Sequence, residues 1–370
     1  MVKIGFAAPF TGDQAIVGIP MRCCAELAIR QANESGQLPC EVRLQAEDDR
    51  AEPLQAEAVA RRLVDDPAVI GVVGHKNSGP SEAAAPIYQA AGLAQLTPSS
   101  TNSHLSQQGF QTFFRLCAPD AVQGRVAAQY AVRVLGVRQA AVIHDQTGYG
   151  RPLAEVVRAA LGQEEAEVVL FEGIRQGATD FSQTVGRIRE LSPDLVYFAL
   201  TEIESALLSR QLRAARVEAL LFGTDGSRES QFLPLAGEAA EGVYQTYAGV
   251  DPERVPAARP FVEAFRARYG PVPVYGAEVY DATNLLLAAL ARAGANVERI
   301  GNSLHRPPEA EKIDRRRILQ KIGRLDPFEG ATGPIRFEPN GDRRDPQVSM
   351  WRVTQGEMQW VGLARDLIPE

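Results

Sequence analysis

The stretch from residue 69 to residue 101 constrains the fold of this chain most strongly. It begins with the β-branched run Val69 to Val73, which is typical of a buried parallel strand. A turn rich in small residues follows, then a run of helix formers from Ala83 to Ala91, and then a second short apolar run over 92–96. A strand, a helix and another strand in this order predict a parallel sheet with a right-handed crossover.

The same alternation occupies most of the chain. Before this stretch, the expected elements are strands over 2–8 and 41–46 and helices over 19–33 and 53–65. After it, a second series is expected, with strands over 139–144, 167–171, 195–200 and 219–222 and helices over 123–135, 151–161, 180–191 and 203–215. Further helix is expected within 260–292, a charged linker and helix entry over 306–317, and a hairpin from strands 347–354 and 358–363. The pattern predicts an α/β fold with two doubly wound parallel-sheet lobes.

Turns that carry hydroxyl groups follow the strands of the first series. In a doubly wound sheet, ligands bind beyond the carboxyl ends of the strands, where the strand order reverses. If the order is 2-1-3-4-5, the turns over 9–13, 75–81 and 97–101 share that edge. Ser78 or Gly79 can cap the helix that follows the second of these turns, and the helix N-terminus would attract a carboxylate. Each turn could equally be an ordinary Ser/Pro turn that caps a helix.

The second series places different side chains at its strand ends. Tyr149, Thr201, Glu202 and Asp225 follow its strands and offer an aromatic ring, a hydroxyl group and carboxylates. Asp120 precedes the first helix of this series and can cap it. The first series thus offers donors suited to a carboxylate, and the second offers an acid suited to an ammonium group.

Composition excludes several classes of protein. With 370 residues the chain is long enough for two domains. No run approaches the ~18 apolar residues that a membrane span needs. The net charge is −7 and the arginines are scattered among acids, so no basic face for a phosphate backbone is visible and no nucleic acid partner is expected.

Neither metal chemistry nor catalysis is indicated by the motifs. The four cysteines and four histidines show no metal-ligand spacing, so no metal or other cofactor is expected. Cys40 could bridge to Cys23 or Cys24 in an oxidising compartment, or the cysteines could be buried thiols. The first turn, AAPFTGDQ, lacks the G-x-G-x-x-G phosphate loop, and no nucleophile motif such as G-x-S-x-G is present. An enzyme is therefore not expected.

A series of short motifs resembles one family over nearly the whole chain. In order they are KIGFAAPFTGD, NESG, EDDRAEP, VIGVVGH with SGPSEAAAPIY, LTPSST, FFRL, VIHD, TDFS, TDGS, EGVY and TGPIRF. No single motif is specific. Their order is similar to that of the branched-chain amino-acid-binding class of periplasmic substrate-binding proteins, which serve ABC transporters.

The resemblance implies a type I periplasmic binding fold, in which two lobes joined by three crossovers close on a ligand in the cleft between them. The crossovers would lie near Ala118, Ala248 to Val250 and Ala331 to Gly333. The N-terminal lobe would comprise residues 1–118 and 250–331, and the C-terminal lobe residues 119–249 and 332–370.

The same resemblance implies a transport function. The expected activity is capture of a small L-amino acid by lobe closure and its delivery to the membrane permease of an ABC transporter. A monomer in the periplasm is expected, with a signal peptide removed ahead of Met1. A cytoplasmic protein would also enter a strand at Val2 with no charged and apolar leader before it. The alternative is a related sensor or binding protein for amides, urea or aromatic acids.

Roles for individual residues also follow from the resemblance. The ligand carboxylate would be bound by Ser78, Ser99, Ser100 and Thr101. The ammonium group would be bound by Asp225 and a backbone carbonyl near Ser99. Tyr149 would be an aromatic ring that closes over the ligand, and Asp120 would lie at the hinge side of the cleft. Donors and a helix N-terminus suit a carboxylate, and an acid suits an ammonium group, so the two lines of reasoning agree.

Some positions depart from the family pattern. Lys76 and Asn77 stand where leucine-type relatives have apolar residues or cysteine, so the disulfide found in some of them cannot form here. Val17 replaces an aromatic residue, and Thr201 with Glu202 replaces another. Lys76 could meet a ligand carboxylate and Glu202 a cationic side chain, or the two could pair with each other. Alternatively, Lys76 reaches solvent and Glu202 caps the helix that follows. These departures argue against a purely aliphatic pocket.

Overall fold

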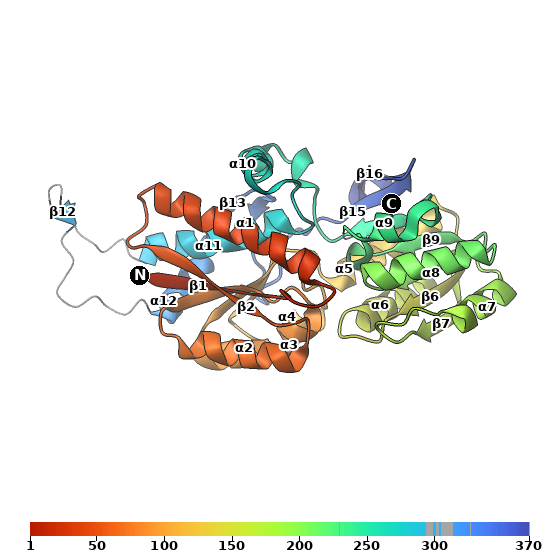
Figure 1. Cartoon of the computed structure of the whole chain (residues 1–370), viewed down its shortest axis with the longest axis horizontal. Coiled ribbons are helices and arrows are strands. Elements are labelled where there is room, and N and C mark those ends of the chain that lie inside the picture. The colour runs from red at the N-terminus through yellow and green to blue at the C-terminus, as the bar shows by residue number, and fades with distance from the viewer. Residues whose placement is uncertain (229, 294–298, 301–302, 305–313, 326, 370) are drawn as a thin grey trace. The chain divides into compact units, whose positions relative to one another are not determined.

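The chain folds into two compact units, each built around one sheet (Figure 1). The computed structural model describes residues 1–370 except 229, 294–298, 301–302, 305–313, 326 and 370. The first unit comprises Met1–Ser100, His104–Cys117 and Pro252–Asp345, and the second comprises Thr101–Ser103, Ala118–Asp251 and Pro346–Glu370. Most of the charged linker expected over 306–317 lies outside the described residues.

The sheet of the first unit is parallel and has five strands in the order β2-β1-β3-β4-β5, which is the order assumed above when the three turns were placed at one edge. The strands are β1 Val2–Ala8, β2 Val42–Asp48, β3 Val69–Gly74, β4 Ala94–Thr97 and β5 Phe113–Arg115. Every residue of β3 and β4 is buried, as expected for apolar runs that are covered on both faces. The carboxyl ends of β1, β3 and β4 therefore share one edge of the sheet.

Helices cover both faces of this sheet, with α1 and α11 on one side and α2 and α3 on the other (Figure 1). The helices of the unit are α1 Ala15–Glu34, α2 Pro53–Asp65, α3 Ser78–Ala91, α4 His104–Gln107, α10 Arg259–Tyr269, α11 Gly276–Ala293 and α12 Arg315–Ile322. Two short antiparallel pairs complete it, namely β11 Arg299–Ile300 with β12 Ser303–Leu304 and β13 Phe328–Gly330 with β14 Gly333–Ile335. The range predicted for α2 is confirmed, since Pro53 provides a clear helix start.

The sheet of the second unit has seven strands in the order β16-β15-β10-β9-β8-β6-β7. The five strands from β10 to β7 run parallel, and β15 and β16 form an antiparallel hairpin at one edge. Their bounds are β6 Gln139–His144, β7 Glu167–Gly173, β8 Leu195–Ala199, β9 Leu220–Gly223, β10 Tyr244–Tyr247, β15 Ser349–Thr354 and β16 Glu357–Leu363. The predicted final hairpin, with its turn at Gln355 and Gly356, is confirmed.

The helices of the second unit are α5 Asp120–Gln129, α6 Gly150–Gln163, α7 Ser182–Leu191, α8 Glu202–Ala214, α9 Phe232–Ala236 and α13 Ala364–Leu367. The single long helix expected over 123–135 starts earlier, at Asp120, and its last turn over Tyr130–Val134 is a π-helix. α5 packs against α6, and α8 packs against α9. The two lobes of predicted α/β architecture are thus both present.

The last passage of the chain from the first unit to the second lies at 345–346, after the region 331–333 that the resemblance implied. The reason is that the β13–β14 hairpin is tied to α11. The N–H groups of Ala331 and Thr332 and the hydroxyl of Thr332 donate to the buried carboxylate of Asp281 at 2.7, 2.8 and 2.6 Å. Arg343 then donates to the Thr332 hydroxyl at 2.8 Å, so this segment packs with the first unit.

The four cysteines are free thiols, so the structure contains no bridge from Cys40 to Cys23 or Cys24. Cys24 and Cys117 are buried. Across the part of the chain that the structure describes, no group of three or more His, Cys, Asp or Glu side chains could hold a metal ion. Nor does any described helix have the length and apolar character required to span a membrane.

Candidate functional site

Two turns of the first unit, those after β3 and β4, are joined by hydroxyl groups. The carbonyl oxygen of His75 accepts hydrogen bonds from Thr97 Oγ1 at 2.9 Å and from Ser100 Oγ at 3.0 Å. The carbonyl oxygen of Lys76 accepts from Ser99 Oγ at 2.8 Å. Because the Ser and Thr hydroxyls of one turn bond the backbone of the other, the two turns form one rigid surface at the carboxyl edge of the sheet.

A fully buried cluster supports this surface from below. His75 Nδ1 lies 2.7 Å from Asp49 Oδ2, and His75 Nε2 lies 3.0 Å from Tyr88 Oη. All three side chains are inaccessible to solvent. Burial raises the pKa of Tyr88 well above its ordinary value, and the negative charges of Asp49 and Glu47 raise it further, so the phenol stays neutral. The ring of His75 is therefore fixed at both nitrogens, and its carbonyl oxygen is fixed with it.

Helix α3 begins at this surface. If Ser78 were its cap, as predicted, the first helical residue would be Gly79, but the helix begins one residue earlier. Ser78 is its first residue rather than its cap, and Asn77 occupies the N-cap position with an extended backbone (φ −95°, ψ 148°). The Asn77 side chain makes no capping bond, because its Nδ2 donates instead to Gln14 Oε1 at 2.9 Å. The N–H groups of a first helical turn have no acceptor within the helix, so this uncapped end is suited to an anion.

Lys76 lies beside this helix end. Its side chain is half-buried, and its Nζ donates to Gln14 Oε1 at 3.4 Å, the oxygen that Asn77 also uses. Gln14 thus orients both residues that depart from the leucine-type pattern. The first turn, after β1, is held separately, since Asp48 accepts from Phe10 N at 2.8 Å and from Thr11 Oγ1 at 2.6 Å. The region next to Ser78 is therefore polar.

A buried acid forms the centre of the corresponding turn in the second unit. Asp225 lies two residues after the end of β9 and is only 3% exposed. Its Oδ1 accepts from Gln123 Nε2 at 2.5 Å and from Tyr149 Oη at 3.0 Å. The Tyr149 hydroxyl also lies 2.7 Å from Thr224 Oγ1 and accepts from Gly226 N at 3.1 Å. Tyr149 is therefore anchored to the acid that the resemblance assigns to an ammonium group.

Electrostatics keeps the surrounding tyrosines neutral. Burial raises the pKa of Tyr149 well above its ordinary value, and the nearby charge of Asp225 raises it further. Burial likewise raises the pKa of Tyr197, with added contributions from Asp225 and Asp120. Two acids and two neutral phenols therefore lie within electrostatic reach of one another, an arrangement that favours a cation.

Thr101 and Asp120 belong to this second unit. Asp120 N donates to the Thr101 carbonyl oxygen at 2.7 Å, and Asp120 is the first residue of α5 rather than its cap, a position that Pro119 takes. The capping prediction for Asp120 is therefore wrong. The hydroxyl of Thr101 is buried and has no hydrogen-bond partner among the described residues. Ser99 and Ser100 belong to the first unit and Thr101 to the second, so the turn over 97–101 contributes to both units.

Thr201 and Glu202 lie at the start of α8. Thr201 is the N-cap residue, and its hydroxyl donates to Glu204. The Glu202 carboxylate is buried and accepts from Gln231 N at 2.9 Å. The alternative in which Glu202 caps α8 is therefore wrong, because Thr201 takes the N-cap position and the Glu202 side chain binds the segment before α9.

Sequence reasoning missed three residues of the Asp225 network, namely Gln123, Thr224 and Tyr197. Gln123 lies on α5, and its Nε2 bonds Thr246 Oγ1 at 2.9 Å as well as Asp225. Thr224 precedes Asp225, so the acid itself was the available signal for it. Tyr197 lies within a buried strand, where a tyrosine is ordinarily a core residue, and nothing in the sequence distinguishes it.

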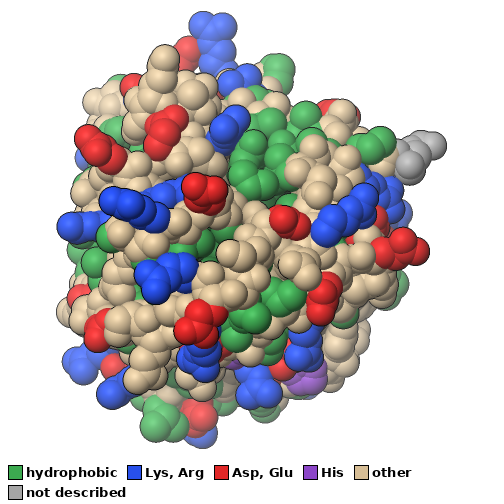
Figure 2. Space-filling view, turned by 90° about the vertical axis from the view of Figure 1, so that its right-hand side faces the viewer, with side chains coloured by type: hydrophobic (Ala, Val, Ile, Leu, Met, Phe, Trp, Pro, Cys, Tyr) green, Lys and Arg blue, Asp and Glu red, His purple; other side chains and the backbone are tan. Residues whose placement is uncertain are grey.

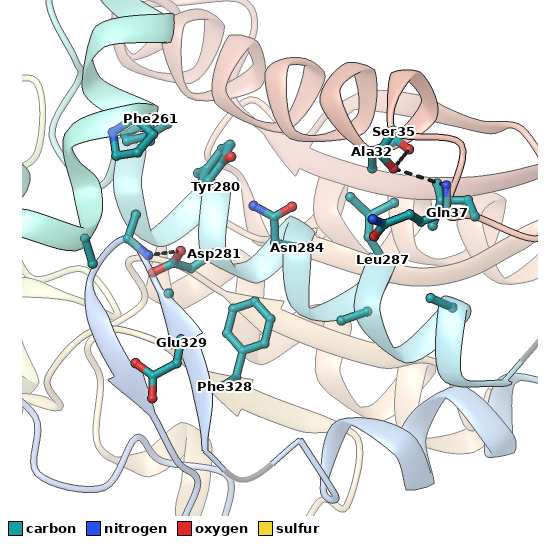
Figure 3. A pocket seen from close by; sticks show the side chains of 17 residues that line it. Ala32, Ser35, Gln37, Phe261, Tyr280, Asp281, Asn284, Leu287, Phe328 and Glu329 are labelled. Carbon is teal, nitrogen blue, oxygen red and sulfur yellow. Dashed lines mark hydrogen bonds between the residues drawn. The ribbon is translucent and has the colours of Figure 1, made fainter. Parts of the chain in front are cut away.

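A separate cavity of about 430 Å³ lies in the first unit, between α1, α10, α11 and β13 (Figure 3). Its wall includes Phe261, Tyr280, Asn284, Leu287 and Phe328. None of the candidate ligand-binding residues predicted from the sequence lines it. Elsewhere, the face seen in Figure 2 carries interspersed basic and acidic side chains without one large patch of a single sign.

Comparisons with known proteins add four findings, namely a family model, one similar protein and two similar solved structures. A family model described as periplasmic binding protein matches residues 1–357. A protein of Pseudomonas aeruginosa named amino acid binding protein is 38% identical over 298 residues, which are 80% of this chain and 79% of that protein.

Two solved structures are also similar. A leucine-binding protein from Thermotoga maritima is 29% identical with a TM-score of 0.85, and the match covers 98% of each chain. An ABC transporter substrate-binding protein from Desulfitobacterium hafniense, solved in complex with Leu, is 26% identical with a TM-score of 0.77, over 97% of this chain and 99% of that one.

Proposed function

Because this chain belongs to the periplasmic binding protein family, we propose that it is an extracytoplasmic solute-binding protein that captures a small L-amino acid. The family assignment and the type I periplasmic binding fold predicted from the sequence are confirmed. Proteins of this family bind solutes and are not enzymes, which also confirms the prediction on catalysis. The observation that carries the proposal is the buried carboxylate of Asp225, held by Gln123 and Tyr149, in a chain whose relatives are named for amino-acid binding.

In this proposal the first unit provides most of the carboxylate site, to which Thr101 of the second unit is added, and the second unit provides the acid for the ammonium group. In the first unit, the uncapped N-terminus of α3, with Ser78, Ser99 and Ser100, receives the carboxylate. In the second unit, Asp225 receives the ammonium group, and Tyr149, hydrogen-bonded to Asp225, is proposed to close over the ligand. Charge-assisted hydrogen bonds at both ends are the strong kind, so they supply affinity as well as orientation.

Thr101 and Asp120 complete the proposed set. Thr101 brings a buried hydroxyl without a partner in the described part of the chain, and a ligand carboxylate would satisfy it. Asp120 adds negative charge close to the tyrosines of the ammonium site. Lys76 and Asn77, oriented by Gln14, are proposed to contact the ligand side chain. Thr201, through Glu204, and Glu202, through the segment before α9, are proposed to shape its surroundings.

Binding is proposed to proceed by closure of the two units on the ligand. A ligand that contacts both units has a higher affinity for the closed state, so it shifts the population toward that state. The closed complex, a monomer in the periplasm, would then deliver the amino acid to the membrane permease of an ABC transporter. The solved relative named as an ABC transporter substrate-binding protein supports this last step.

A thermal-shift screen tests the proposed function. The purified protein is heated with each of the twenty L-amino acids and, separately, with urea, short amides and benzoate-type acids. A ligand that binds only the folded state raises the unfolding midpoint by mass action, and at a hundred times its Kd it adds about 2.7 kcal/mol of stability. At least one small amino acid is expected to raise the midpoint. A shift with urea, amides or aromatic acids alone would reject amino-acid binding in favour of the alternative function.

A further inference from the structure

Tyr197 carries a buried hydroxyl that nothing in the described structure satisfies. It lies on β8, is only 1% exposed, and its Oη has no hydrogen-bond partner among the described residues. Buried hydroxyl groups in native proteins nearly always have a partner, because burying one without a partner costs free energy. An unsatisfied phenol in the middle of a well-packed strand therefore points to a partner outside the described residues.

The surroundings of Tyr197 define the chemistry of that partner. Its ring packs against Phe222 of β9, with the ring centroids 5.7 Å apart, and Tyr197 is paired with Phe222 in the sheet. Phe222 precedes Asp225 by three residues, so the strand that anchors the ring leads directly to the acid. The charges of both Asp225 and Asp120 act on the Tyr197 hydroxyl. The partner must therefore be compatible with two nearby acids.

A second unsatisfied acceptor lies in the same network. Gln123 donates through Nε2 to Asp225 and Thr246, yet its buried Oε1 has no hydrogen-bond partner within the described residues. The phenol oxygen of Tyr197, the amide oxygen of Gln123 and the carboxylate of Asp225 are all acceptors. A group with several N–H donors and a positive charge matches this set, and an ammonium group has three such donors.

We propose that Tyr197 is a ligand-binding residue, whose hydroxyl accepts a hydrogen bond from the ammonium group of the bound amino acid, directly or through one ordered water. This inference rests on the proposed function and extends its ammonium site beyond Asp225. Gln123 orients Asp225 through its amide and offers its oxygen to the same site.

The test is Tyr197→Phe, which keeps the ring against Phe222 and removes only the hydroxyl. Calorimetry measures the Kd of the parent and the variant for the L-amino acid that binds most tightly among the twenty, and for its 2-hydroxy acid, in which a hydroxyl replaces the ammonium group. We expect Tyr197→Phe to weaken binding of the amino acid about 10-fold or more, because a hydrogen bond to a charged group is lost. Binding of the 2-hydroxy acid is expected to change much less.

Tyr130→Phe is the matched control. Tyr130 is also buried and its ring also faces Phe222, at 6.3 Å, but its neighbours are Tyr244 and Arg352 rather than the acids. It should leave both Kd values unchanged. The unfolding midpoint of ligand-free Tyr197→Phe should equal or exceed that of the parent, since an unsatisfied buried hydroxyl is removed.

Each remaining outcome is decisive. Equal amino-acid affinity in the parent and Tyr197→Phe, or an equal loss for the amino acid and its 2-hydroxy acid, would overturn the role of Tyr197 while leaving the proposed function intact. If the parent bound none of the twenty amino acids, the proposed function itself would fail, and the role of Tyr197 would fail with it.

Discussion

Replacing Asp225 by asparagine is expected to weaken binding of the amino acid by about 30-fold or more, with little change in the free energy of unfolding. Truncating or neutralising one partner of a buried, hydrogen-bonded charge pair costs roughly 2–5 kcal/mol of binding free energy, and each 1.4 kcal/mol is about tenfold in Kd. Stability should persist because the asparagine oxygen can still accept from Gln123 and Tyr149 as the carboxylate does. Calorimetric titration gives Kd, and urea unfolding gives the stability.

Asp180→Asn provides the control for this prediction. Asp180 is an exposed acid of the same unit that accepts from Ser182 N at 2.9 Å, so the substitution removes the same charge away from the site. Asp180→Asn should bind as the parent does. If Asp225→Asn and Asp180→Asn had the same Kd, the ammonium group would not be held by Asp225.

Arg115→Met is expected to lower the stability of the protein by about 3–5 kcal/mol, the usual cost of removing one partner from a buried ion pair. Arg115 is fully buried, and its Nε and Nη2 donate to Asp342 Oδ1 at 2.8 and 2.6 Å. Its Nη2 also donates to Ser106 Oγ at 2.8 Å, and its Nη1 to the carbonyl oxygen of Ser100 at 3.2 Å. Methionine fills much of the space but leaves Asp342 and these oxygens without their donor.

Two further variants test whether the lost ion pair causes that loss of stability. Arg115→Met combined with Asp342→Asn should recover part of it, because no uncompensated carboxylate then remains. Arg259→Met, which removes an arginine from a highly exposed pair with Glu263, should change stability little. Unfolding in urea measures the free energy of unfolding of the parent, Arg115→Met, the double variant and Arg259→Met. An Arg115→Met variant as stable as Arg259→Met would show that the Arg115 cluster does not hold this unit together.

Local sequence patterns predicted the architecture well. Buried β-branched runs and helix formers in alternation predicted a parallel sheet covered by helices, and Pro53 fixed the start of α2. Gln355 and Gly356 predicted the turn of the last hairpin. These features depend on the residues of one segment and its immediate neighbours, so a single sequence contains the information.

Side-chain roles at the helix starts were harder to predict. A serine or aspartate near a helix start suggests a cap, but Ser78 and Asp120 are first helical residues instead. At α3 the reason is tertiary, because Gln14 of a distant segment binds Asn77 and leaves the helix end uncapped. The position of the last passage depends in the same way on Asp281, which binds residues far along the chain.

The candidate site was only partly visible in the sequence. Family resemblance indicated Asp225 and Tyr149, and the structure shows that these two side chains are hydrogen-bonded to each other. Gln123 and Tyr197 were not indicated, since a glutamine on a helix and a tyrosine in a buried strand are ordinary residues in those places. What singles them out is that Gln123 Oε1 and Tyr197 Oη have no hydrogen-bond partner among the described residues, together with the neighbouring acids.

The most direct test of the account is a crystal structure of the protein grown with the amino acid that gives the largest thermal shift. The account predicts one bound molecule, with its carboxylate at about 3 Å from donors of the α3 N-terminus and Ser78 and its ammonium group at hydrogen-bond distance from Asp225. An amino acid that contacts neither Ser78 nor Asp225, or one found in the cavity lined by Tyr280 and Phe328, would contradict it.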